Sequence, residues 1–342
     1  MRLAYERVVV HTANPFVISR GGGSEYVRVR VTLTDGDGVQ GIGEAAPSAF
    51  YGETADTVVA ALEALRPVIE NGDAWALELL EAALARALRG NAAARMGVSA
   101  AAHDLVGKRL STPLYRLWGL TPAAAPRSSF TIAIAPSDEE LARRVAQAAA
   151  YPVLKIKLGT DRDDDIIRTV RAAAPEKTIR VDANAAWTPK QALAMIERLA
   201  RAGVEFVEQP LPPADLDGLR FVRERSALPI IADESCVTSA DIPRLAGAVD
   251  GINIKLAKCG GLREATRMIA AARAHGMRVM MGCMIETSLG ITAAAHLAPL
   301  LDYADLDGAA LLSDDPYDGA TIAGGRIAIP DAPGLGVRPR AR

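Results

Sequence analysis

Five charged residues recur along the second half of the chain, each at the end of a short apolar stretch. They are Lys157, Asp182, Glu208, Asp233 and Lys255, and successive members lie 22 to 26 residues apart. One strand–helix unit occupies about 25 residues, so this period predicts that consecutive parallel strands end in these side chains. In a closed barrel the carboxyl ends of the strands meet on one face. The pattern therefore predicts that five charges share one mouth.

The three carboxylates of this set predict a cation site. Burying several uncompensated charges is costly, and a shared metal ion offsets that cost. A ligand set of Asp182, Glu208 and Asp233 contains only oxygen donors, which favours one Mg²⁺ per subunit, with Mn²⁺ as a surrogate. Zinc would be expected to recruit histidine or cysteine ligands.

The two lysines of the set suit proton transfer at a carbon atom. One would remove the proton α to a carboxylate, and the other would deliver a proton to the opposite face. A free lysine, with a pKa of roughly 10.4, is a poor base at neutral pH, but a neighbouring cation lowers its pKa. Lys155, two residues before Lys157 on the same strand face, and the metal ion would both act in this way. The metal would also stabilise an enediolate.

Two different patterns of secondary structure position these residues. The first 45 residues or so favour strands, at Val8–Val10, at Tyr26–Leu33, and at Val39–Gly43 after the hairpin signal Asp35–Gly38. Ser19–Ser24, with three glycines, is predicted to be a flexible loop. From Thr54 to about Gly107 the pattern is helical, which predicts a small α+β module over residues 1–115.

From about residue 128 strands and helices alternate. At least seven βα units favour a closed (β/α) barrel, whereas an open doubly wound sheet is the second choice because no G-x-G-x-x-G turn is present. The tail after Ser313, with a short strand at Arg326–Ile329, is expected to pack on the N-terminal module. The predicted barrel strands are Phe130–Ala133, Leu154–Lys157, Ile179–Asp182, Phe206–Glu208, Ile230–Asp233, Gly251–Lys255 and Val279–Gly282.

Composition restricts the class of protein. The chain has 342 residues, half of them apolar, and a net charge of −2, so it can bury a large core and carries no charge signal for nucleic acid or an anionic membrane. No long uncharged apolar run and no secretory signal is found, and the cysteines Cys236, Cys259 and Cys283 lack metal-type spacing. We expect a cytoplasmic protein with reduced thiols.

The motifs around the charged residues resemble the enolase superfamily, within it the muconate lactonizing enzyme subgroup. This resemblance spans nearly the whole chain. It implies a modified (β/α)₇β TIM-like barrel at 116–314, and an α+β capping domain at 1–115 completed by the tail at about 315–342. It also implies Mg²⁺ on the three carboxylates and acid/base chemistry by Lys157 and Lys255. The motifs are Lys155-Ile156-Lys157, Asp182-Ala183-Asn184, Val207-Glu208-Gln209-Pro210, Asp233-Glu234-Ser235 and the segment Ile254–Gly261.

Within that subgroup the segments Gly282–Gly290 and Asp305-Leu306-Asp307 resemble dipeptide epimerases of the Ala-Glu type. The resemblance implies that the two aspartates bind the free α-ammonium of a dipeptide, which two carboxylates on one strand face could do. It also implies substrate contacts for Lys155, Thr131 and Cys283. Arg20 either contacts the substrate, as an arginine of the covering loop does in that family, or is solvated.

Several alternatives remain open from the sequence. Another activity of the subgroup, as an N-acylamino acid racemase, an o-succinylbenzoate synthase or a cycloisomerase, would leave the aspartate pair unexplained. A Schiff-base aldolase would leave the three carboxylates unexplained, and a non-catalytic scaffold would leave the whole charged set without a role. His275 and His296 are expected to be ordinary helix residues. We expect a dipeptide substrate, no nucleic-acid or membrane partner, and a homo-oligomer.

Overall fold

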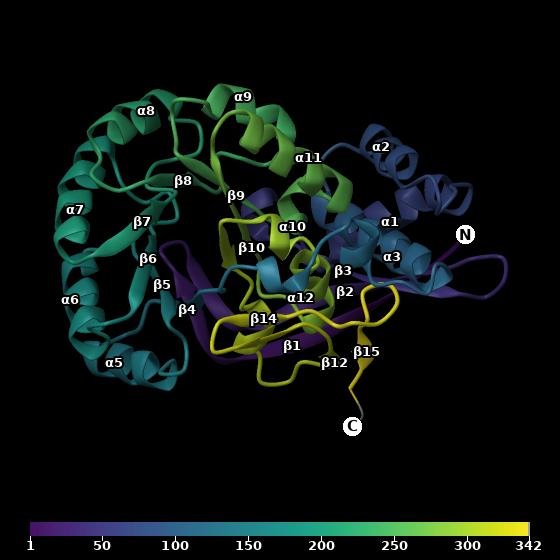
Figure 1. The fold of residues 1–342 in the computed structure, drawn as a ribbon, viewed down its shortest axis with the longest axis horizontal. Coiled ribbons are helices and arrows are strands. Elements are labelled where there is room, and N and C mark those ends of the chain that lie inside the picture. Colours follow the sequence, from purple (N-terminus) through teal and green to yellow (C-terminus); the bar gives the residue numbers. More distant parts are fainter. Residues whose placement is uncertain (341–342) are drawn as a thin grey trace.

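A ring of parallel strands surrounded by helices occupies one side of the molecule, and a second layer of strands and helices lies beside it (Figure 1). This computed structural model describes residues 1–340. The elements that precede the barrel are β1 (Arg2–Ile18), β2 (Gly21–Thr34), β3 (Gln40–Ala45), η1 (Ala49–Tyr51), α1 (Ala55–Glu70), α2 (Leu77–Ala87), α3 (Ala92–Arg109), α4 (Leu114–Leu117) and η2 (Pro122–Ala124).

Seven strand–helix units and an eighth strand form the barrel. At the start of several helices a side-chain oxygen accepts a backbone N–H of the first turn, as Ser137 does for α5 and Thr188 does for α7. The elements are β4 (Phe130–Ile132), α5 (Asp138–Gln147), β5 (Val153–Lys157), α6 (Asp163–Ala173), β6 (Thr178–Asp182), α7 (Pro189–Arg201), β7 (Val204–Glu208), α8 (Leu216–Arg225), β8 (Ile230–Ala232), η3 (Ser239–Asp241), α9 (Ile242–Leu245), β9 (Gly251–Ile254), α10 (Leu256–Cys259), α11 (Leu262–Ala274), β10 (Arg278–Gly282), α12 (Ser288–Ala295), η4 (Ala298–Leu300), β11 (Tyr303–Asp305) and η5 (Gly308–Leu311).

The strand order confirms the closed barrel. Strands β4 to β11 pair in sequence order, all parallel. The ring closes between its first and last strands, because Ser128 bridges Ala304 and the Ser129 amide donates to the Ala304 carbonyl at 3.0 Å. The open doubly wound sheet is therefore wrong. All seven barrel strands expected from the sequence are present, and β11 is the eighth.

The barrel interior is layered by the alternation of side chains along each strand. The residue two positions before a mouth residue points inward one layer deeper. In this deeper layer Phe206, Ile231, Met280 and Tyr303 form a separate buried apolar cluster. The Arg180 guanidinium lies over the rings of Phe206 and Tyr303, 5.3 and 4.8 Å from their centroids. Side chains therefore fill the barrel below the charged mouth.

Helix α3 joins the N-terminal sheet to the barrel. It is buried along most of its length and is built largely from alanine, glycine and serine. Gly41 and Gly43 of β3 allow the close approach, since a Cβ on Gly43 would lie 2.3 Å from the Gly97 carbonyl oxygen. Small residues on β3 and α3 therefore let the sheet pack closely against the helix.

The hairpin of β1 and β2 reaches across to the barrel mouth. Ile18 pairs with Gly21, so Ser19 and Arg20 alone form the turn, and the following glycines belong to β2. The sequence expectation of a flexible loop over Ser19–Ser24 is wrong, because only Ser19 and Arg20 form a turn and Gly21–Ser24 belong to strand β2. The Val17 carbonyl also accepts the Ile134 amide at 2.9 Å, which ties the hairpin to the barrel.

The C-terminal tail contacts both parts of the molecule. The Leu335 amide donates to Asp104 of α3 at 2.8 Å, whereas the Ser128 amide, at the start of the barrel, donates to the Gly325 carbonyl at 2.8 Å. The division at residues 115 and 314 stays a prediction, and residues 341–342 of the predicted tail lie outside the described residues. The tail strands are β12 (Tyr317–Asp318), β13 (Thr321–Ala323), β14 (Arg326–Ala328) and β15 (Arg338–Pro339).

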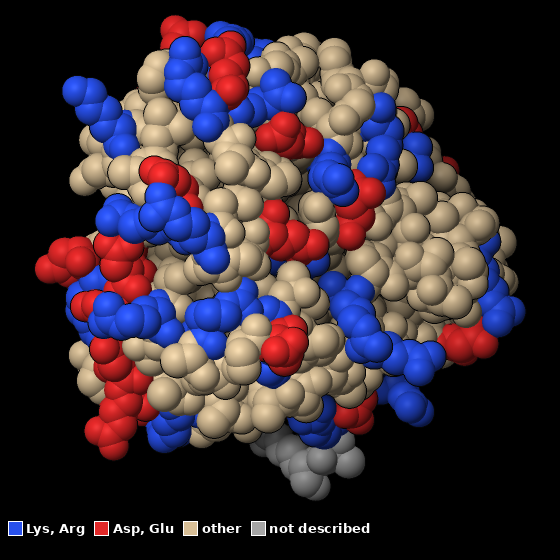
Figure 2. All heavy atoms as spheres, turned by 60° about the vertical axis from the view of Figure 1, so that its left-hand side comes forward, with Lys and Arg blue, Asp and Glu red and all other residues tan. Residues whose placement is uncertain are grey.

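The charged surface is mixed. On the face drawn in Figure 2, basic and acidic side chains are intermixed. Many arginines of the protein have an acidic neighbour within ion-pair distance, as Arg198 has in Asp164 at 2.9 Å. Among residues 1–340, none of the helices has the length and apolar character needed to cross a membrane.

Candidate active site

The three predicted metal ligands meet at the mouth of the barrel. Asp182 and Glu208 end β6 and β7, and Asp233 directly follows β8. One oxygen from each carboxylate lies within 4.8 Å of the others, and all three residues are buried. The Glu208 Oε2 atom accepts no hydrogen bond, although the Lys155 ammonium is 2.8 Å away. A buried all-oxygen set of this size suits a hard divalent cation.

Neighbouring groups hold these carboxylates in position. The backbone N–H of Asn184 donates to Asp182 at 2.8 Å, and the side-chain amide of Asn253 donates to Glu208 at 2.8 Å. Burial disfavours ionisation of all three, but Lys157 and Lys155 outweigh burial at Asp182 and lower its pKa to about 2. Burial and the charge of Asp182 raise the pKa of Glu208 to about 7.

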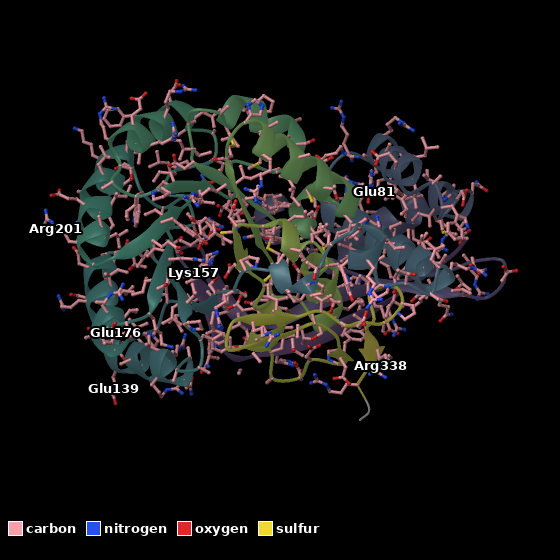
Figure 3. The ribbon with its side chains drawn as sticks, viewed as in Figure 1. Glu81, Glu139, Lys157, Glu176, Arg201 and Arg338 are labelled. Atoms are coloured by element: carbon pink, nitrogen blue, oxygen red, sulfur yellow. The ribbon has the colours of Figure 1, made fainter. Side chains whose placement is uncertain are left out.

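The two predicted catalytic lysines face each other across the mouth. Lys157 ends β5 and Lys255 follows β9, so three strands of the ring separate them on either side. The Lys157 ammonium lies 2.6 Å from Asp182, and that of Lys255 lies 2.8 Å from Asp233. Burial alone would lower the pKa of Lys255, but Asp233 outweighs it, so the pKa is raised. Figure 3 shows Lys157 inside the ring, whereas Arg201 and Glu139 point outward from the surrounding helices.

Lys155 lies beside Lys157, as the sequence predicts. Its ammonium is 3.3 Å from the same oxygen of Asp182 that Lys157 contacts, and 2.7 Å from Asp305. Burial opposes its charge, yet the surrounding carboxylates, led by Asp305, raise its pKa. Lys155 is therefore a buried ammonium that holds several carboxylates together.

The aspartates Asp305 and Asp307 lie at the β11 side of the mouth, and they differ. Asp305 ends the strand and accepts hydrogen bonds from Lys155 and, at 2.6 Å, from the Ser129 hydroxyl. Asp307 follows the strand and accepts the Thr131 amide at 2.5 Å, while burial and the charge of Asp305 raise its pKa to about 7. Strand β11 ends at Asp305, so the two aspartates do not share one strand face, and their binding of a substrate ammonium stays a prediction.

A cavity of about 430 Å³ connects these groups beneath the hairpin. Its charged floor comes from the barrel, and the hairpin, the η1 turn and the loops after β10 and β11 supply the apolar part of its wall. Thr131 and Cys283, both predicted to contact substrate, line it as well. Burial raises the pKa of the Cys283 thiol, which is consistent with a packing role. The apolar wall residues are Phe16, Ile18, Phe50, Met284, Ile285 and Leu311.

Arg20 lies at the tip of the hairpin with its charge already paired. Its guanidinium is 2.7 Å from Glu234, donates to the Asn184 carbonyl, and stacks over the Phe50 ring at 4.3 Å. Arg20 therefore joins the hairpin to the loops after β6 and β8. Arg20 also lines the cavity, and its side chain keeps 32% of its exposure, so whether it contacts the substrate or is only solvated stays a prediction.

Sequence reasoning missed two other buried cations. Lys258 donates to both the carboxylate and the carbonyl of Asp233 at 2.6 Å, and only its place in the Ile254–Gly261 motif hinted at a role. Arg28 lines the cavity from β2, where the alternating strand gave no sign that its outer face is covered by the barrel. His296, by contrast, is buried in the core, where it bonds the Leu335 carbonyl and the Tyr115 amide.

An eight-stranded barrel whose mouth gathers three carboxylates between two lysines is typical of α/β-barrel enzymes, which carry their active sites at this end. Comparison with known proteins agrees. Residues 138–342 match the family described as Enolase C-terminal domain-like, and residues 3–119 match the Mandelate racemase / muconate lactonizing enzyme, N-terminal domain. The chain belongs to this enolase-superfamily group, and it is an isomerase of the racemase and epimerase type.

Three relatives illustrate the similarity. The L-Ala-D/L-Glu epimerase of Bacteroides thetaiotaomicron is 42% identical over 302 residues, which are 88% of this chain and 78% of the relative. A substrate-liganded complex of the L-Ala-D/L-Glu epimerase from Bacillus subtilis has a TM-score of 0.95 at 32% identity and covers 100% and 99% of the two chains. The dipeptide epimerase from Enterococcus faecalis, solved with Mg and L-Leu-L-Tyr, has a TM-score of 0.93 at 32% identity and covers 98% of each chain.

Proposed function

We propose that the protein is a Mg²⁺-dependent dipeptide epimerase that inverts the α-carbon of the C-terminal residue. The observation that carries this proposal is the placement of Lys157 and Lys255 on opposite sides of the ring, with the carboxylate triad between them. Inversion at carbon needs a proton acceptor on one face and a proton donor on the other. The names of the similar proteins support the choice of a dipeptide.

In the inversion one lysine would act as the base and the other as the acid. One lysine, as the neutral amine, takes the α-proton, and the C–H electron pair moves into the substrate carboxylate to give an enediolate. The opposite lysine, as the ammonium, delivers its proton to the other face of the carbon. Bound by Asp182, Glu208 and Asp233, Mg²⁺ would act as a Lewis acid toward the substrate carboxylate. In the reverse direction the two lysines exchange roles.

The free ammonium of the dipeptide would bind beside β11. Asp307 has a carboxylate that faces the cavity and accepts a single backbone amide, from Thr131, whereas Asp305 is paired with Lys155. We therefore assign the main ammonium contact to Asp307, with Asp305 as the second carboxylate. An N-acylamino acid racemase, an o-succinylbenzoate synthase or a cycloisomerase binds no such ammonium, so this feature favours the dipeptide.

The proposal is tested with a dipeptide library in deuterated buffer containing Mg²⁺. We expect epimerised product with one solvent-derived α-deuterium, detected by mass spectrometry and chiral separation, and loss of turnover with EDTA that Mg²⁺ or Mn²⁺ restores. Each active dipeptide is compared with its N-acetylated form. Preference for the acetylated form would support the N-acyl alternative, and no exchange with any dipeptide would refute the epimerase.

Two expectations about the whole protein stay predictions. A homo-oligomer would be checked by light scattering of the purified protein, and a cytoplasmic location by cell fractionation.

A further inference from the structure

The three carboxylates at the barrel mouth share one pattern of hydrogen bonding. One oxygen of each accepts a hydrogen bond from a donor that belongs to the barrel framework. Oδ1 of Asp182 accepts the backbone N–H of Asn184 at 2.8 Å, Oε1 of Glu208 accepts the side-chain amide of Asn253 at 2.8 Å, and Oδ1 of Asp233 accepts the Lys258 ammonium at 2.6 Å.

The second oxygen of each carboxylate faces lysines that line the cavity. Lys155 lies 2.8 Å from Oε2 of Glu208, Lys157 lies 2.6 Å from Oδ2 of Asp182, and Lys255 lies 2.8 Å from Oδ2 of Asp233. The two oxygens of each carboxylate therefore have different partners. One is held by the framework, and the other is turned toward the groups of the cavity.

Lys258 holds its oxygen of Asp233 more firmly than a single contact would. The residue is buried in α10, and its ammonium donates to Oδ1 and to the carbonyl of Asp233, both at 2.6 Å. It also donates to the Asn253 carbonyl at 2.8 Å and to the Cys236 carbonyl at 3.0 Å. An ammonium has three donors, so these four acceptors use its whole bonding capacity.

The same ammonium is connected to a second carboxylate of the triad. Asn253 of β9 gives its carbonyl to Lys258 and donates its side-chain amide to Glu208. Lys258 therefore joins the loop after β8 to strand β9, and it acts on Asp233 directly and on Glu208 through Asn253. Partners behind metal ligands in this way orient the ligands and tune the metal that they bind.

A carboxylate that offers one oxygen suits Mg²⁺ better than Ca²⁺. Mg²⁺ demands a near-octahedral arrangement, into which both oxygens of one carboxylate fit poorly, whereas the larger Ca²⁺ takes more oxygens and accepts a carboxylate through both. We propose that Lys258 is a positioning residue that keeps Oδ1 of Asp233 away from a bound cation and thereby makes the site prefer Mg²⁺ to Ca²⁺. This inference rests on the metal site of the proposed function.

The test measures the affinity of the full chain for Mg²⁺ and, separately, for Ca²⁺ by titration calorimetry without substrate. The wild type is expected to bind Mg²⁺ more tightly. Lys258→Met keeps the length of the side chain and removes the ammonium, so the ratio of the Mg²⁺ to the Ca²⁺ affinity should fall by roughly tenfold. The loss of a positive charge acts alike on two divalent cations, so the ratio reports the coordination.

A second variant and a matched control accompany this measurement. Asn253→Ala releases Oε1 of Glu208 without changing the charge of the site, and it should lower the same ratio. Lys177→Met is the control, because the Lys177 ammonium also donates to three backbone carbonyls, those of Ala148, Ala149 and Tyr151, and touches no carboxylate of the triad. It should leave the ratio unchanged. Circular dichroism would show which variants are folded.

Several results would overturn the inference. Binding of Ca²⁺ as tight as that of Mg²⁺ by the wild type would do so without any variant. An unchanged ratio in Lys258→Met, even with both affinities reduced, would show that Lys258 only holds the loop after β8 against β9. If Lys258→Met does not fold, an unchanged ratio in Asn253→Ala has the same force. Absence of binding of either cation to the wild type would refute the metal site of the proposed function itself, which is a distinguishable failure.

Discussion

The ammonium of Lys155 lies 2.7 Å from Oδ2 of Asp305, in a buried ion pair that joins β5 to β11 across β4. Lys155 outweighs burial at Asp305 and lowers its pKa, whereas Asp307, two residues later, has its pKa raised to about 7. One aspartate is thereby fixed as an internal counter-ion. The two members of one sequence motif therefore lie in different electrostatic surroundings.

Replacing Asp307 by Asn tests this division. Under the proposed function the variant should lose roughly tenfold to a hundredfold in kcat/KM for a free dipeptide, because a charge-assisted contact to the ammonium is lost. The effect on an N-acetylated dipeptide should be small. In the wild type, kcat/KM should fall as the pH drops through about 7, where Asp307 takes up a proton, and the fall should be shallower in the variant, which lacks this group. A pH profile unchanged in the variant would remove Asp307 from ammonium binding.

The two lysines give a stereochemical prediction. Lys157→Ala and Lys255→Ala should each abolish epimerisation, since inversion needs both faces of the α-carbon. Each variant should still exchange the α-proton of the diastereomer whose proton points at the surviving lysine, so the two variants should show opposite preferences when followed by proton NMR in deuterated buffer. Exchange of the same diastereomer by both would contradict the two-face arrangement.

Asp233→Asn should weaken Mg²⁺ binding by at least about tenfold and abolish turnover, because one of three anionic ligands is lost. The change also removes a charge that Lys255 and Lys258 contact at 2.8 and 2.6 Å. Titration calorimetry with Mg²⁺ measures the metal affinity apart from catalysis. Asp305→Asn serves as a control, since Asp305 lies outside the triad, and it should keep the larger share of the Mg²⁺ affinity. Near-normal affinity in Asp233→Asn would exclude Asp233 as a ligand.

The buried acid Glu286 predicts how stability depends on pH. Its pKa is raised from 4.5 to about 7 by burial, so between these values the folded protein holds a proton that the unfolded chain has lost. The free energy of unfolding should therefore fall as the pH rises through this range. Glu286→Gln should make the fall shallower between pH 5 and 8, as measured by urea unfolding. A slope equal to that of the wild type would show that Glu286 ionises normally in the folded state.

The regular part of the site was predictable because barrel geometry is periodic. A charge at the end of each strand, at intervals of one βα unit, was enough to bring Asp182, Glu208 and Asp233 together and to set the two lysines on either side. The same reasoning placed the barrel strands. This prediction depended on the strands forming a closed barrel, and the bridge between Ser128 and Ala304 closes the barrel.

The parts that escaped prediction depend on contacts between distant segments. Alternation in β2 shows that Arg28 and Val29 face opposite ways, but it cannot show that the Arg28 face is covered by the barrel rather than by water. In the same way, the glycines after Arg20 suggested flexibility, because nothing local reveals that Glu234 pairs with Arg20 and holds the turn. Glu234 lies 214 residues from Arg20 in the sequence, so no local pattern could show this ion pair.

The apolar cluster of Phe206, Ile231, Met280 and Tyr303 fills the barrel below the charged mouth, so the site opens to solvent at the mouth. Substrate, product, water and protons must all pass the same rim, on which the hairpin tip rests. A proton taken up by a lysine while the rim is covered has no second route to bulk water. In deuterated buffer the first product molecules should then carry the label, while unreacted substrate keeps its hydrogen until the rim is uncovered.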